Sequence, residues 1–220
     1  MVKPIRTTLI ATLMFALVAQ AQVVTEDAGE RLVNSFVDDV VTFSGDFEQV
    51  LLDPDGEVLE RTTGTLEISR PGKFRWSYVE PYEQWLIADG LNIWSYDVDL
   101  AQVTVKPQAE ALANTPALLL GGSGDALGQF EYHGSYEEAA TTWVRLVPKN
   151  TESGFMRVEL GFLEDTLYRM VFFDNLEQTT LVEFDGVVVN GEIDQQRFVF
   201  SVPDDVDVVG MPAVADASAP

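Results

Sequence analysis

Few side chains in this sequence have the type and spacing that catalysis requires. His133 is the only histidine and cysteine is absent, so the chain has no thiol nucleophile and no histidine cluster for a metal ion. The segment Gly122-Ser123-Gly124 differs from a nucleophile elbow, because position 125 is aspartate and the preceding residues do not predict a strand. A serine–histidine pair would have to use His133, which we interpret as a surface residue of a strand.

Carboxylates are the other source of reactive groups, since the chain has 36 acidic residues. A glycosidase needs two of them at a defined separation across a cleft, and the sequence does not single out a pair. Asp53, Asp55 and Glu57 surround Gly56 as in a calcium loop, but the glutamate needed at the twelfth position is replaced by Gly64. We therefore predict a hairpin turn here, no metal, no cofactor and no enzymatic activity. An acidic periplasmic hydrolase is kept as an alternative.

Aromatic residues form a stronger pattern than any of these polar groups. Phe74, Trp76 and Tyr78 alternate with Arg75 and Ser77, so a strand would place three rings on one face. More aromatic residues follow at predicted strand positions: Trp85, Trp94 and Tyr96. A half-open sheet with this much aromatic surface favours a lipidic ligand over a catalytic centre.

The elements that would position these rings are mostly strands. One amphipathic helix is predicted at 25–41, and a helical insertion at 108–128, where alanines and Asn114-Thr115-Pro116 break the two-residue period. The resulting fold is mainly β, a curved antiparallel sheet with helices on its concave side. Strands are predicted near 43–52, 57–69, 73–79, 84–89, 91–97, 102–106, 129–135, 142–148, 155–162, 167–174, 178–185, 187–193 and 196–202.

The first 21 residues predict a cleaved signal peptide. Lys3 and Arg6 precede an apolar run, and Ala19-Gln20-Ala21 is a cleavage site of small residues. We expect an exported single domain over 22–210, followed by a flexible tail over 211–220.

The charge of the chain excludes several classes of partner. Its formal net charge is −23, and removing the signal peptide makes it about −25. Such a charge opposes binding to nucleic acid and to anionic lipid headgroups. The acidity is explained either by solubility in a saline medium or by a basic partner, and the first explanation is preferred.

Several short motifs occur in a fixed order between Leu32 and Gly210. In this order they resemble the LolA family, the periplasmic carriers that move lipoproteins from the inner to the outer membrane of Gram-negative bacteria. The motifs are Phe43-x-x-x-Phe47-x-Gln49, Gly64-x-Leu66-x-Ile68-x-Arg70-Pro71-x-x-Phe74-x-Trp76, Pro81-x-x-Gln84, Asp89-Gly90-x-x-x-Trp94-x-Tyr96-Asp97, Gln102-Val103-Thr104-Val105, Asn114-Thr115-Pro116-Ala117-x-Leu119-Leu120, Leu146-x-Pro148-Lys149, Asp174 and Phe198-x-Phe200-x-x-Pro203-x-x-Val206-Asp207.

The resemblance implies a fold and a function. The expected fold is a half-barrel of about eleven antiparallel strands, closed by a lid of short helices over a hydrophobic cavity. The expected function is that of a monomeric periplasmic chaperone. It would take acylated lipoproteins from an inner-membrane ABC release complex to an outer-membrane receptor. A periplasmic lipid or glycolipid carrier on the same scaffold is the nearest alternative.

The resemblance also implies roles for individual residues. Arg70 would latch the lid by hydrogen bonds to its backbone, and Phe74 would act in cargo handling at the inner membrane. We expect about half of the aromatic residues to contact the ligand, since such cavities are mostly apolar. The predicted cavity residues are Trp76, Tyr78, Trp85, Ile87, Trp94 and Tyr96, and the predicted lid residues are Pro116, Leu118, Leu119 and Leu120.

Overall fold

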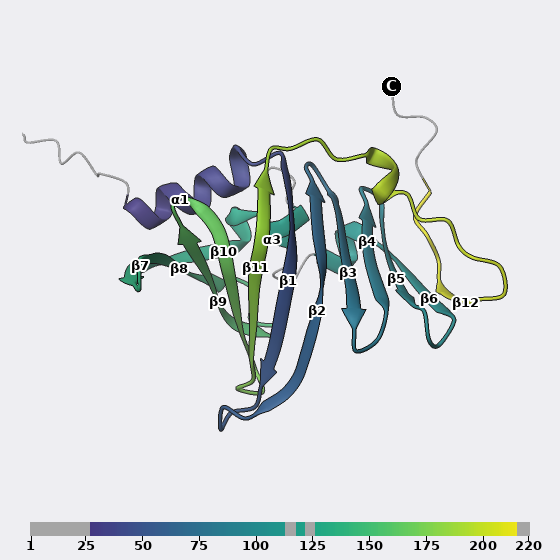
Figure 1. Cartoon of the computed structure of the whole chain (residues 1–220), viewed down its shortest axis with the longest axis horizontal. Helices are drawn as coiled ribbons and strands as arrows, with labels where there is room; N and C mark the ends of the chain where they lie inside the picture. Colours follow the sequence, from purple (N-terminus) through teal and green to yellow (C-terminus); the bar gives the residue numbers. More distant parts are fainter. Residues whose placement is uncertain (1–26, 113–117, 122–125, 215–220) are drawn as a thin grey trace, which may run out of the picture.

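One strongly curved sheet dominates the computed structural model, which describes residues 27–112, 118–121 and 126–214 (Figure 1). The predicted signal peptide, Pro116, the Gly122-Ser123-Gly124 segment and residues 215–220 lie outside this part of the chain. Within the described residues the sheet has twelve strands, in the order β12-β6-β5-β4-β3-β2-β1-β11-β10-β9-β8-β7.

Each strand pairs with the next in an antiparallel ladder, except that β12 runs parallel to β6. β7 and β12 are the two edges and do not pair with each other, so the sheet stays open. The predicted half-barrel is therefore confirmed. The strands are β1 (Thr42–Leu52), β2 (Val58–Ser69), β3 (Lys73–Glu80), β4 (Gln84–Asp89), β5 (Asn92–Asp97), β6 (Gln102–Pro107), β7 (Phe130–Glu138), β8 (Thr141–Pro148), β9 (Phe155–Leu163), β10 (Thr166–Asp174), β11 (Thr179–Val189) and β12 (Asp207–Gly210).

Turn chemistry explains the longest hairpin of the sheet. β1 and β2 are joined at Asp53, whose carboxylate accepts hydrogen bonds from the backbone N–H groups of Asp55 and Glu57. Such an Asx turn holds the chain in place for strand pairing. The prediction of a hairpin turn at this position is confirmed.

The concave face of the sheet carries the core, and α1 (Ala28–Asp38) packs at one end of it. Asp27 caps α1 by accepting from the N–H of Gly29, and the same carboxylate accepts from the hydroxyls of Tyr132 and Ser135 on β7. Val33 and Phe36, one turn apart, are buried against the sheet. The helix is thus fixed to the edge of the sheet by a polar cap and an apolar face.

The predicted helical insertion after β6 is present in the described residues. It contains α2 (Gln108–Leu112), α3 (Leu118–Gly121) and a 3₁₀ turn, η1 (Leu127–Gln129). α2 lies against β5 and β6, whereas α3 lies against β2 and β3. Figure 1 shows α3 within the curve of the sheet, where short helices can cover the concave face.

The C-terminal strand predictions are partly wrong. Residues 179–185 and only the first three residues of 187–193 form one continuous strand, β11, and residues 196–202 form no strand. Asp194 instead caps a 3₁₀ turn, η2 (Gln195–Phe198), by accepting from the N–H of Gln196, and Phe198 is buried. The alternation that suggested a strand arises because Phe198 and Phe200 both pack onto the sheet from outside it.

The folded chain also continues past residue 210, where the domain was expected to end. Asn92 exchanges two hydrogen bonds with the backbone of Ala213, so the start of the predicted tail is attached to β5. The parallel strand β12 was not predicted either.

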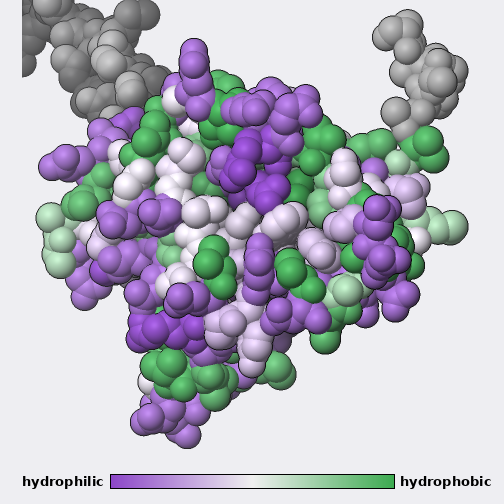
Figure 2. All heavy atoms as spheres, turned by 45° about the vertical axis from the view of Figure 1, so that its right-hand side comes forward, coloured by the Kyte–Doolittle hydropathy of each residue, from purple (hydrophilic) through white to green (hydrophobic). Residues whose placement is uncertain are grey.

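No helix in the described ranges is long and apolar enough to span a bilayer. Figure 2 shows hydrophilic residues over most of one face, with hydrophobic ones scattered among them.

Candidate ligand-binding site

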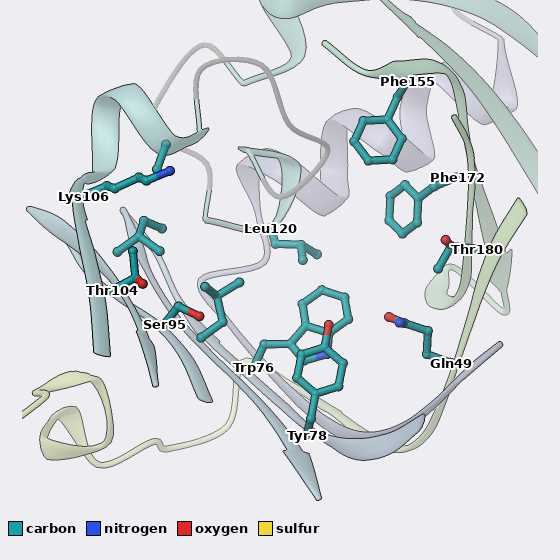
Figure 3. Close-up of a pocket in the computed structure, with 13 residues that line it drawn as sticks. Gln49, Trp76, Tyr78, Ser95, Thr104, Lys106, Leu120, Phe155, Phe172 and Thr180 are labelled. Carbon is teal, nitrogen blue, oxygen red and sulfur yellow. The ribbon is translucent and has the colours of Figure 1, made fainter. Parts of the chain in front are cut away.

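A largely apolar cavity of about 640 Å³ lies on the concave face of the sheet (Figure 3). Leu120 of α3 and Ala111 of α2 reach into it from the covering segment, and strands from both halves of the sheet form its walls. Its volume falls in the range of about 300–1,000 Å³ that is typical of small-ligand sites. The remaining lining residues are Gln49, Trp76, Tyr78, Leu86, Ile93, Ser95, Thr104, Lys106, Phe155, Phe172 and Thr180.

Two of the six predicted cavity residues, Trp76 and Tyr78, line this cavity. Their rings stack at a centroid distance of 6.1 Å, and Phe47 meets both rings edge to face. Alternate residues of β3 therefore present a continuous aromatic floor. Of the lid residues, Leu120 lines the cavity and Leu119 is fully buried beside it. Pro116 and the side chain of Leu118 lie outside the described part of the structure.

The other four predicted cavity residues lie on the opposite, convex face, so their assignment to the cavity is wrong. Residues that pair directly across neighbouring antiparallel strands have their side chains on the same face of the sheet. Trp85 on β4 pairs with Ser77 on β3 and with Tyr96 on β5. In the same way, Ile87 pairs with Arg75 and with Trp94. Ser77 and Arg75 alternate with the aromatic floor of β3. Trp85, Ile87, Trp94 and Tyr96 therefore all point away from the cavity.

The C-terminal segment gives these convex residues their role. Phe200 lies 5.3 Å from the ring of Trp94 and 5.9 Å from that of Tyr96, measured between centroids. The Arg75 guanidinium lies 4.5 Å from the centre of Trp85, and Ile87 is fully buried. The aromatic residues of β4 and β5 thus form a second, smaller core between the sheet and the returning chain.

The sequence reasoning missed the wall opposite these strands. Phe155 on β9 and Phe172 on β10 face the cavity and meet edge to face, with centroids 6.1 Å apart. The neighbouring Phe173 points to the other face, where Arg157 lies over its ring. The alternation in this part of the sequence signals two faces, but it does not say which of them borders the cavity.

Arg70 occupies the position expected of a latch. Its guanidinium donates to the backbone oxygen of Leu119 in α3 at 2.9 Å. It also donates to the oxygens of Phe36 and Val40 at the end of α1, at 2.7 and 2.6 Å. One arginine therefore connects the sheet, the covering helix α3 and helix α1, which suits its planar set of donors.

A second connection between the sheet and α3 was not predicted. The N–H of Gly72 donates to the oxygen of Gly121 at 2.7 Å. The oxygen of Gly72 in turn accepts from the Gln108 side-chain amide at 2.6 Å, and that amide's oxygen accepts from Gly90 at 3.1 Å. The turn between β2 and β3 thus holds the covering segment through both Arg70 and Gly72.

Burial shapes the electrostatics of the site. It lowers the pKa of the Arg70 guanidinium to about 10, so the group remains charged at neutral pH. Burial is the larger cause and the negative charge of Glu60 the smaller one that raise the pKa of Tyr78 to about 12, so its hydroxyl remains neutral at neutral pH.

Phe74, the residue expected to act in cargo handling, is fully buried in the core and is not available to a partner in this conformation. Most of the described surface that lines the cavity is apolar.

Comparison with known proteins places this geometry in a family. Residues 38–201 match the family described as outer membrane lipoprotein carrier protein LolA. The chain is 41% identical to the outer-membrane lipoprotein carrier protein of Nitrosospira multiformis, over 84% of this chain and 90% of the relative. It is 39% identical to that of Chromohalobacter salexigens, over 90% of this chain and 93% of the relative.

A solved structure supports the fold independently. An uncharacterized conserved protein from Thermus thermophilus superposes with a TM-score of 0.52 at 14% identity, covering 81% of this chain and 97% of that one. At this identity the likeness concerns the fold alone. The family match and the sequence relatives span most of the chain, and they decide the assignment: the chain belongs to the LolA family of outer membrane lipoprotein carrier proteins.

Proposed function

We propose that this chain is a periplasmic chaperone that shields the acyl chains of lipoproteins and carries them to the outer membrane. The observation that carries the proposal is the apolar cavity of about 640 Å³ beneath α3, with an aromatic floor at Trp76 and Tyr78. Relatives that share most of its length are outer-membrane lipoprotein carrier proteins, which supports the choice of cargo. The protein acts by binding, and its signal peptide is removed after Ala21.

The energetics of acyl burial explain why such a carrier needs a cover that can open. Each buried CH₂ contributes about 0.8 kcal/mol, so three chains of about fifteen carbons would release roughly 35 kcal/mol on full transfer. Non-covalent affinities saturate near about 18–21 kcal/mol, and cargo held more tightly could not be handed on. Binding must therefore be partial or opposed, and breaking the contacts of α3 with Arg70 and Gly72 opposes it.

Two membrane partners complete the proposal. The carrier receives cargo from an inner-membrane ABC release complex and delivers it to an outer-membrane receptor with a more hydrophobic site. Phe74 acts in the loading step. Because its ring is buried, the lid must move before a partner can contact it.

A spheroplast assay tests this function. Spheroplasts that synthesise labelled lipoproteins are incubated with the purified protein, and the soluble fraction is examined for released lipoproteins. We expect release with the wild-type protein and a loss of release with Phe172→Asn, which places a polar amide in the cavity wall. The matched control is Phe173→Asn, since the neighbouring ring lies on the other face. The proposal fails if no lipoprotein is released, or if both folded variants release equally.

A further inference from the structure

A second compartment, mostly polar, adjoins the apolar cavity near the turn between β3 and β4. Its volume is about 470 Å³, and Gln49 and Tyr78 line both spaces. Figure 3 shows the hydroxyl of Tyr78 and the side-chain amide of Gln49 directed inward at this boundary. A ligand in the apolar cavity therefore meets polar side chains at this end. Among the other residues that line the polar compartment are Glu60, Thr62, Gln84 and Asp97.

The register of the sheet explains why its concave face becomes polar here. Tyr78 on β3 pairs with Gln84 on β4, and Gln84 pairs with Asp97 on β5, so these side chains share the concave face. The adjacent row on the same face begins at Trp76 and lines the apolar cavity. Polarity thus changes along the strands, from apolar side chains beneath α3 to a polar row at the far end.

Two hydroxyl groups at this end have no hydrogen-bond partner among the described residues. Thr62 lies directly across the β1–β2 ladder from Gln49 and is 6% exposed, and its hydroxyl is buried and unpaired. The Tyr78 hydroxyl is also unpaired, and burial is the main cause that raises its pKa to about 12. A buried donor without an acceptor destabilises a folded protein. These hydroxyls therefore do not stabilise the fold, and an acceptor from a ligand would offset their cost.

The groups available at this end match a neutral acceptor. Hydroxyl and amide groups donate to carbonyl oxygens, and each acyl chain ends in the carbonyl of an ester or amide bond. When the chains lie against Trp76 and Leu120, the carbonyls are the next atoms of the ligand, and Tyr78 is the next residue of β3 on the same face. A phosphate matches less well, because Glu60 and Asp97 line the same compartment and repel an anion.

We propose that the hydroxyls of Thr62 and Tyr78 bind the carbonyl oxygens through which acyl chains are attached to the cargo. The proposal rests on the proposed function and adds an orientation to it, with the chain ends beneath α3 and the attachment point at the polar compartment. Every acylated cargo carries this linkage, so the site binds the lipid part of the cargo and does not distinguish among the attached peptides. A hydrogen bond between neutral groups changes an equilibrium constant by about two- to tenfold.

The test compares two lipopeptides of the same peptide sequence and chain length, one with two ester-linked acyl chains and one with two ether-linked alkyl chains. The ether lipopeptide lacks the two carbonyl oxygens. Displacement of a neutral fluorescent apolar probe from the full protein gives both dissociation constants, below the concentration at which the lipopeptides aggregate. Thr62→Val and Tyr78→Phe each remove one hydroxyl with little change of shape. Thr65→Val is the matched control, because Thr65 lies on the same strand and pairs with Ser77 on the convex face.

We expect the wild-type protein and Thr65→Val to bind the ester lipopeptide at least about fourfold more tightly than the ether lipopeptide, since two hydroxyls contribute. Thr62→Val and Tyr78→Phe should each reduce this preference about two- to tenfold and leave the affinity for the ether lipopeptide unchanged. Thr62→Val should also keep or raise the midpoint of urea unfolding, because its hydroxyl is unpaired within the described structure. A merely structural hydroxyl would instead destabilise the protein when removed.

Equal binding of the two lipopeptides by the wild-type protein overturns the proposal and leaves the proposed function standing. A preference that survives unchanged in both variants, or a clear loss of stability in Thr62→Val, also overturns it. If only one variant lowers the preference, the assignment of the other hydroxyl is wrong. Failure of the wild-type protein to bind either lipopeptide counts against the proposed function itself.

Discussion

Replacing Arg70 with leucine is expected to loosen α3 from the sheet. Of the bonds that hold α3, the substitution removes one, from the guanidinium to the oxygen of Leu119, and leaves the backbone bond from Gly72 to Gly121 in place; the two bonds to the end of α1 are lost as well. A hydrogen bond from a charged donor contributes about 1.5–3 kcal/mol. The open form should therefore become about 10- to 150-fold more populated, since each 1.4 kcal/mol is about a tenfold change in an equilibrium constant.

Amide hydrogen exchange measures this opening directly. The N–H of Gly72 is bonded to the oxygen of Gly121, so its exchange reports release of α3 without monitoring Arg70 itself. Arg75→Leu is the matched control, because it removes an arginine from the next strand whose guanidinium lies over Trp85 on the other face. Amides in the centre of the sheet report global stability in the same samples. This separates lid opening from unfolding caused by the lost bonds to Phe36 and Val40.

The functional consequence is a carrier that retains its cargo. Without the latch, cargo binding no longer has to break the bond between Arg70 and Leu119, so bound cargo is held more tightly and passed on more slowly. Transfer from the loaded protein to outer membranes should fall in Arg70→Leu and stay normal in Arg75→Leu. Gly72 exchange within twofold of the wild-type rate, or unchanged transfer, would refute the latch.

Three further outcomes follow from the packing. Relative to Tyr78→Phe, the wild-type protein should lose about 3 kcal/mol of stability as the pH rises through about 10–12, because the pKa of Tyr78 is about 12 in the folded protein and near 10 when unfolded. Urea titrations of the two proteins measure this difference, in which the opposite contribution of Arg70, whose pKa is lowered to about 10, cancels; equal pH dependence in both would contradict it. Gly64→Ala should lower the free energy of unfolding by about 1–3 kcal/mol or more, since a Cβ would overlap the backbone oxygen of Ser77; an unchanged urea midpoint would contradict this. Trp76→Ala should weaken binding of a neutral apolar probe about tenfold, whereas folded Trp85→Ala should bind it normally; equal losses would contradict the assignment of faces.

Local patterns were sufficient to predict most strands of this protein. Side chains in a strand alternate between two faces, so runs such as Phe74 to Tyr78 predict a strand wherever it lies in the sheet. The β1–β2 hairpin was also predictable from local sequence, because the Asp53 carboxylate accepts hydrogen bonds from backbone groups within four residues of itself. The strand predicted at residues 196–202 was wrong for a related reason. Alternating aromatic residues can also occur in a segment that crosses the face of a sheet and buries its rings there without pairing with a strand.

The faces of the strands could not be assigned from the same patterns. Alternation shows that Trp85 and Leu86 point in opposite directions, but only pairing with β3 decides which of them borders the cavity. A shift of one residue in the connecting turn would reverse the assignment. The C-terminal segment adds to the difficulty, because it covers the convex face and gives aromatic residues there an apolar environment of their own.

The amino-acid sequence by itself determined the two-residue period, the helical interruption after β6, the strong acidity and the family of this chain. Each of these depends on residue types and their spacing along the chain. Tertiary structure alone decided that Phe155 and Phe172 face Lys106 across a cavity, and that Gly72 shares with Arg70 the hold on α3. These contacts join segments that are far apart in the sequence, and their formation depends on the curvature and register of the whole sheet.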